Sequence, residues 1–224
     1  MSTVKTRESL AILVPLLLGA LCVCTGCARR GNGDPSALHY TLPTRLIVQA
    51  GSHLPGTAIQ YLGESEKGAH VLIEGQEAVK RVGDSLNWRG EPLSGAEISL
   101  ALRVLSYNAE SLQLIGTAEV DVSGAQPRAA PMVKTAPITH NGLVAYRVSK
   151  GHTVPGSTIV YEGSSEEGAR LGGISGYPFR KSGDSIVWEG LLLDGLYLSL
   201  ELRLVQYDEQ SMNVAGVVTF WFGV

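Results

Sequence analysis

Apolar residues fall on every second position in several segments of the chain. In 98–104, ISLALRV, the apolar residues alternate with Ser, Ala and Arg, and 198–204, LSLELRL, repeats the pattern. A second alternating segment follows each of these after a short polar loop at 107–111 or 207–211. A period of two places apolar side chains on one face of a β-strand, and two such strands joined by a short loop form a hairpin. No segment after the first thirty residues has a helical period, so we expect an all-β protein.

The chain also aligns with itself at an offset of 100 residues. Between 51–116 and 151–216, 24 of 66 positions are identical without a gap, where chance gives roughly 6%. The identical positions include Trp88 and Trp188, which we expect in equivalent and largely buried places. A spacing of 100 is too long for a solenoid unit and fits two globular modules.

We therefore predict two tandem homologous β domains, copy 1 at 38–124 and copy 2 at 138–224. The segment between them, 125–137, has three prolines and no apolar periodicity, which is typical of a semi-rigid linker. About seven short strands per copy favour a small antiparallel β-sandwich, with a partly open β-barrel as the alternative. Besides the long hairpin, strands are expected in copy 1 at 45–49, 57–62, 69–73, 78–82 and 84–88.

The first 27 residues have the organisation of an export signal. Lys5 and Arg7 precede an apolar run at 10–23, and small residues then lead to Cys27. This is the charged region, apolar region and cleavage zone of a secretory signal. The end of the segment, CTGC at 24–27, resembles the lipobox of bacterial lipoproteins, although Cys24 stands where that family usually has Leu or Val. The resemblance implies cleavage before Cys27, acylation of Cys27 with palmitate as one of several chains, and stable membrane anchoring.

Two alternatives to the lipobox remain open. One is an ordinary signal peptide without lipid. The other is an uncleaved transmembrane anchor, because 10–27 is at the short limit for spanning a bilayer, although Arg29 and Arg30 on the exported side oppose the positive-inside preference. All three cysteines lie at 22, 24 and 27, so residues 28–224 have no thiol for a disulfide or a thiolate metal site. Residues 28–37, rich in Gly with Asp, Pro and Ser, are expected to form a flexible tether.

Charge and motifs exclude several classes of function. The chain has 18 Lys and Arg against 21 Asp and Glu, with a net charge of −3, so it lacks the basic face that nucleic-acid binding needs. The five histidines have no metal-ligand spacing, no Gly-x-Ser-x-Gly motif occurs, and no carboxylate pair can be placed at a catalytic separation. We therefore expect no metal, no cofactor and no enzymatic activity.

Some polar residues recur in both copies. Asp84 and Asp184 lie in Gly-Asp-Ser turns, where a carboxylate can accept backbone N–H bonds. Arg103 and Arg203 lie on the outer face of a long strand, where Arg103 could pair with a carboxylate such as Glu119. We interpret these residues as structural.

A duplicated scaffold can keep its fold while one copy acquires a separate contact surface, and the two copies differ in two places. Copy 2 replaces an ordinary strand segment by three glycines within five residues, followed by Tyr177, Pro178 and Phe179. On the outer face of its last strand, Val217, Thr219 and Trp221 stand where copy 1 has Thr, Glu and Asp. Hairpin packing of Tyr177 and Phe179, and packing of Trp221 between the copies, are the structural alternatives. We take Tyr177, Phe179 and Trp221 as a candidate partner surface.

These observations favour a non-catalytic protein anchored in the cell envelope, on the exported side of a membrane. An outer-membrane or cell-surface location is favoured over the soluble periplasm. Its β modules would bind another envelope protein or a cell-wall polymer, or serve in a structural assembly. The alternatives are a lipid-anchored envelope enzyme, and a carrier or sensor of a small ligand in a barrel cavity.

Overall fold

A computed structural model describes residues 29–30, 36–131 and 138–223, and all regular structure in this part is β-strand. The all-β prediction is confirmed. Copy 1 contributes seven strands, which are β2 (Leu38–Gln49), β3 (Ile59–Ser65), β4 (Gly68–Ile73), β5 (Gln76–Lys80), β6 (Ser85–Leu93), β7 (Ala96–Tyr107) and β8 (Ser111–Val122). Copy 2 contributes seven more, which are β10 (Ile138–Ser149), β11 (Val160–Ser165), β12 (Gly168–Gly172), β13 (Phe179–Arg180), β14 (Ser185–Leu193), β15 (Leu196–Tyr207) and β16 (Ser211–Phe222).

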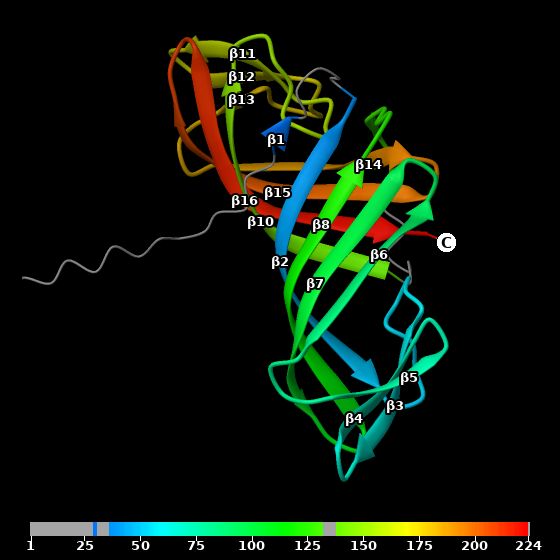
Figure 1. Ribbon diagram of the computed structural model, residues 1–224. Coiled ribbons are helices and arrows are strands. Elements are labelled where there is room, and N and C mark those ends of the chain that lie inside the picture. Colours follow the sequence, from blue (N-terminus) through cyan, green and yellow to red (C-terminus); the bar gives the residue numbers. More distant parts are fainter. Residues whose placement is uncertain (1–28, 31–35, 132–137, 224) are drawn as a thin grey trace, which may run out of the picture.

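Each copy forms one long sheet and one short sheet, and all strand pairs are antiparallel (Figure 1). The short sheets have the orders β3-β4-β5 and β11-β12-β13. The long sheets have the orders β1-β2-β8-β7-β6 and β10-β16-β15-β14-β9, where β1 (Arg29–Arg30) and β9 (Arg128–Ala129) are two-residue strands. None of these sheets closes into a barrel among the described residues, and the arrangement is consistent with the predicted antiparallel β-sandwich-like domains.

Within each copy, the short sheet lies at one end of the long sheet (Figure 1). A buried tyrosine ties the two sheets together, because the Tyr61 hydroxyl donates to the backbone carbonyl of Asn108, 2.5 Å away in the loop between β7 and β8. Tyr161 makes the equivalent bond to the carbonyl of Asp208 in copy 2. Burial raises the pKa of Tyr161 to about 12, so its hydroxyl stays protonated and continues to donate.

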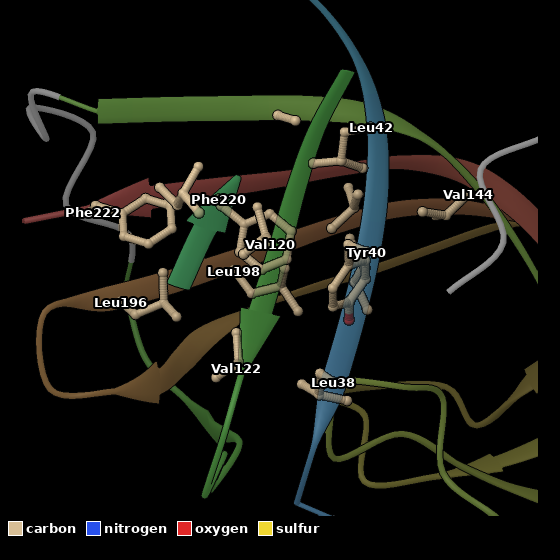
Figure 2. Close-up of a cluster of buried hydrophobic side chains, with 14 of the residues drawn as sticks. Leu38, Tyr40, Leu42, Val120, Val122, Val144, Leu196, Leu198, Phe220 and Phe222 are labelled. Atoms are coloured by element: carbon tan, nitrogen blue, oxygen red, sulfur yellow. The ribbon is translucent and has the colours of Figure 1, made fainter. Parts of the chain in front are cut away.

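The other end of each long sheet packs against the opposite copy. Figure 2 shows β2 and β8 of copy 1 crossing β15 and β16 of copy 2, with apolar side chains between them. Tyr40 meets Phe220 edge to face, with the ring centroids 4.8 Å apart, a favourable aromatic geometry. Leu42 lies directly on Gly142 of β10, where an added Cβ would come within 2.8 Å of it. The two copies therefore share one continuous hydrophobic core.

Contacts between the copies are reciprocal. Ile138 of copy 2 covers Gly56 of copy 1, and Leu38, the residue equivalent to Ile138, approaches Gly156 of copy 2. The hairpin turns that follow β6 and β14 meet in the same way, because Leu193 lies near Gly95 and Leu93 lies near Gly195. Equivalent residues thus exchange contacts, as across the two-fold axis of a homodimer.

Part of the segment between the copies is itself a strand. Arg128 and Ala129 form β9, which pairs with Leu191 and Gly190 on the outer edge of β14. The N–H of Gln126 donates to the carbonyl of Leu192 at 2.9 Å. The second copy therefore gains its fifth strand from the chain that leads into it.

Candidate functional site

The polar residues that recur in both copies hold turns and strand ends. The carboxylates of Asp84 and Asp184 accept the backbone N–H groups of Arg81 and Lys181, each at 2.7 Å. This confirms the turn role expected for the two aspartates.

Arg103 and Arg203 also have a structural role, but their partners differ from the expected carboxylates. Arg103 donates to the carbonyl of Gly83 at 2.8 Å, and Arg203 donates to that of Gly183 at 2.9 Å. Neither arginine forms an ion pair with a described residue, so the proposed pairing of Arg103 with Glu119 does not occur. These contacts belong to the scaffold that both copies share and do not distinguish one copy from the other.

One difference between the copies lies on the outer face of the long sheet in copy 2. Leu143, Val187 and Val217 are 57%, 60% and 37% exposed there. Leu143 and Val217 are cross-strand partners, and Trp221 lies half-buried on the same face, between Thr139 and Tyr197 in register. We call Leu143, Val187, Val217 and Trp221 the outer apolar face. Large apolar side chains grouped on a surface mark contact sites more often than single ones do.

Copy 1 has a charged surface in the same place. Position 121 is Asp, and its carboxylate lies 2.6 Å from Nδ1 of His39 across the sheet. Arg89 and Glu97 form an ion pair at 2.6 Å. The remaining equivalents of the outer apolar face are Pro43, Asn87 and Thr117. At these four positions the apolar character belongs to copy 2, whereas copy 1 exposes Ile47 and Ile115 at other positions of its outer face.

Phe179 begins β13 of the short sheet in copy 2, and Tyr177 lies in the loop just before it. Their ring centroids are 5.5 Å apart, and Tyr177 is 62% exposed while Phe179 is half-buried. Neither belongs to the hydrophobic core or to the residues packed against it. Both border an open hollow of about 680 Å³, which is also lined by Glu166, Glu167, Lys181 and Asp184.

The structure brings Tyr177 and Phe179 together and places Trp221 elsewhere. The hollow reaches Ser185 at the start of β14, which is in register with Arg203 and Ala215. Trp221 lies six residues farther along β16, a distance of about 20 Å at the rise of a β-strand. Cys27, the predicted lipidation site, lies outside the described residues. The candidate partner surface therefore divides into two places, the outer apolar face and the hollow.

Sequence reasoning did not select Leu143 and Val187. The signal was present in the repeat, because these two residues replace Pro43 and Asn87 at the offset of 100. Such a change from proline or amide to aliphatic, at a position facing away from the core, distinguishes the copies without altering their fold.

A buried histidine lies in the core between the copies. His140 is 5% exposed, its ring meets that of Phe222 edge to face, and its Nδ1 has no hydrogen-bond partner among the described residues. Burial lowers the pKa of His140 to about 4. The side chain is therefore neutral at pH 7, and its buried ring packs against Phe222 on the inner face of β10.

In the described part of the chain, no group of three His, Cys, Asp or Glu residues could hold a metal ion. The same part has no helix long and apolar enough to cross a membrane. The chain has no significant match to any protein-family model, curated protein or solved structure. The surface differences between the copies are consequently the basis for a functional proposal.

Proposed function

We propose that this protein is a lipid-anchored protein of the cell envelope that binds another protein through the outer apolar face of its second copy. The lipobox-like sequence at 24–27 supports the anchor, and the exposed Leu143, Val187 and Val217 support the binding surface. The single observation that carries the proposal is the one-sided difference between two copies of the same sheet.

The outer apolar face differs from ordinary surface variation in its arrangement. Its aliphatic members lie in one row across the sheet, where Leu143 pairs with Val217, Val217 with Glu201, and Glu201 with Val187. The exposed fractions of Leu143, Val187 and Val217 show that the described residues leave much of this row open. Exposed side chains of this kind contribute to stability only when a surface removes them from water, at about 25 cal/mol per Å². A second protein supplies that surface.

Charges at the row indicate the chemistry of the partner. Glu201 lies within it and Glu189 lies beside it, and neither carboxylate forms an ion pair with a described residue. An apolar patch flanked by unpaired carboxylates fits a partner with apolar side chains and flanking Lys or Arg. Opposite charges at the rim favour the correct register and speed association.

The binding surface is tested by giving copy 2 the residues that copy 1 has at the same positions. The triple variant Val187→Asn, Val217→Thr, Trp221→Asp should abolish photo-crosslinking to a discrete protein from a crosslinkable residue at 143, in the full-length protein in its own envelope. The reciprocal control places the crosslinker at 43, where no discrete product is expected. Equal products from 43 and 143 would contradict the proposal.

The anchor has a separate test. Cys27→Ala should leave an unprocessed precursor or release the protein from membranes, and it should abolish incorporation of labelled palmitate. Wild-type protein that incorporates no palmitate would disprove lipidation, while leaving the binding surface to its own experiment.

A further inference from the structure

The hollow beside Tyr177 comes from a rebuilt hairpin. In copy 1, β4 and β5 pair through five residues and turn tightly at Glu74 and Gly75, both with positive φ. In copy 2, β13 pairs with β12 through only two residues, and 173–178 forms a loop with positive φ at Gly173 and Gly176. The loop carries Tyr177 outward to the edge of the hollow.

Hydrogen bonds to the backbone carbonyls of residues 177–179 hold the segment that carries the two aromatic rings. The guanidinium of Arg180 donates to the carbonyls of Tyr177, at 2.5 Å, and Phe179, at 2.9 Å. The carbonyl of Pro178, between the two aromatic residues, accepts the N–H of Leu171 at 2.9 Å. A platform ordered before binding loses little conformational entropy when a ligand arrives. Copy 1 has Glu77, Ala78, Val79 and Lys80 at these positions and lacks both the rings and the guanidinium.

Polar groups around the platform are available for a ligand. Asp184 is engaged with the backbone of Lys181, but the side chains of Glu166, Glu167 and Lys181 form no hydrogen bond or ion pair with described residues. The hollow thus offers carboxylate acceptors and an ammonium donor within one space of about 680 Å³.

We infer that this hollow binds a neutral carbohydrate, with a sugar ring stacked on Tyr177. A pyranose presents a flat C–H face to an aromatic ring, and each of its hydroxyls both donates and accepts hydrogen bonds. Mixed donors and acceptors around an exposed aromatic platform match those two requirements. Carboxylates and cations are mixed in the lining, so the site does not select a polyanion. The two-residue β13 is too short to extend a sheet with an added peptide strand. This inference is independent of the outer apolar face.

The test uses full-length protein in detergent micelles with cellohexaose, maltohexaose and chitohexaose as probes. At least one of these should bind with a dissociation constant in the millimolar range or tighter, measured by isothermal titration calorimetry. Tyr177→Ala should weaken binding at least tenfold without lowering the melting temperature, because the ring is 62% exposed. Tyr177→Phe should retain binding, and Glu77→Ala in copy 1 is the matched control that should leave it unchanged.

A second measurement distinguishes the classes of ligand. A photo-crosslinkable residue at 166, which lines the hollow and leaves Tyr177 in place, should give products in cells whose size falls after glycosidase treatment. Products sensitive only to protease would show a peptide partner and overturn the inference. Failure of all three oligosaccharides to bind, or binding that survives Tyr177→Ala, would overturn it as well.

Discussion

Strands β6 and β14 occupy the same position in the two copies but end their sheets differently. In copy 2, Leu191 and Leu192 are buried and β9 covers the edge of β14. In copy 1 the equivalent residues are Glu91 and Pro92, and no described strand pairs with the outer edge of β6. A charge and a proline on an edge strand discourage further pairing. The edge of β14 is thus protected from further strand pairing by β9, and the edge of β6 is protected by its own residues.

The two equivalent tryptophans also differ, in their burial. Trp188 is 5% exposed, and its indole N–H donates to Thr158 Oγ1 at 2.9 Å. Trp88 has the same register but is half-buried, and Ala58 stands at the position of Thr158. The expected equivalence of place is confirmed, whereas full burial holds for Trp188 alone. An identical residue in the two copies thus indicates the same place in the fold, whereas the neighbouring residues that differ determine how deeply it is buried.

The largest difference between equivalent substitutions in the two copies is expected in the core that they share. Phe220→Ala should lower the free energy of unfolding by about 3–5 kcal/mol, because a buried aromatic ring is lost against Tyr40. Its copy 1 equivalent, Val120→Ala, removes less volume and should cost about 2 kcal/mol. Urea denaturation measures both. Thr219→Ala on the outer face is the control, and a Phe220→Ala loss no larger than that of Thr219→Ala would contradict a core shared by the copies.

Acid should act on copy 2 through His140, where copy 1 has Tyr40. The folded protein keeps the His140 pKa at about 4, while the unfolded chain has 6.5. Between these values the unfolded state binds more protons, so the contribution of neutral His140 is complete above pH 6.5 and is lost as the pH falls toward 4. The loss amounts to about 3 kcal/mol.

His140→Leu should flatten this part of the pH dependence, measured by urea denaturation between pH 7 and pH 4.5. His53→Leu, at an exposed histidine, should keep the slope of the parent protein. Identical slopes for the parent and His140→Leu would rule out this origin of acid sensitivity.

The covered edge of copy 2 can be opened from the linker. Gln126→Pro removes the N–H that bonds to the carbonyl of Leu192, with an expected loss of about 1–2 kcal/mol in stability. Hydrogen exchange of the β14 amides should accelerate, while that of β6 should not change. Gln126→Ala keeps the N–H and should behave like the parent; equal effects of the two substitutions would contradict a role for this bond.

The smallest effects should be equal in both copies. Asp84→Ala and Asp184→Ala each remove a carboxylate that accepts one backbone N–H at 2.7 Å, and each should cost about 1 kcal/mol. Thermal denaturation of the single variants and of the double variant provides the measurement. Since the turns are far apart in sequence and make the same bond, a clearly unequal pair of losses would show that the scaffold roles have diverged.

Much of the fold follows from local pattern, because alternation specifies which side chains of a strand are buried. The strand expected at 45–49 begins earlier, at Leu38. It tolerates Pro43, which has no backbone N–H to donate, because β1 pairs with this strand only at Leu38 and His39 and leaves the rest of its outer edge unpaired. Alternation does not say what covers a buried face. It therefore predicted a sandwich in each copy but not that Tyr40 and Phe220 meet between copies.

The candidate site was predictable to the same degree. Tyr177 and Phe179 stood out because they break the repeat, and they do lie together. Trp221 also breaks the repeat, but sequence offset contains no information on distance across a sheet. Leu143 and Val187 were missed because aliphatic residues in strands are ordinarily read as core.

The reciprocal contacts of the copies have a consequence for how the surface can change. In a homodimer every substitution appears twice, so a new patch at one site is matched by its twin across the axis. Here both halves are encoded in one chain, and Trp221 and Asp121 can differ at the same position. Covalent fusion thus lets the two copies carry different surfaces. Copy 1 keeps a charged, solvated surface, while copy 2 can change without creating a second, identical patch that could self-associate.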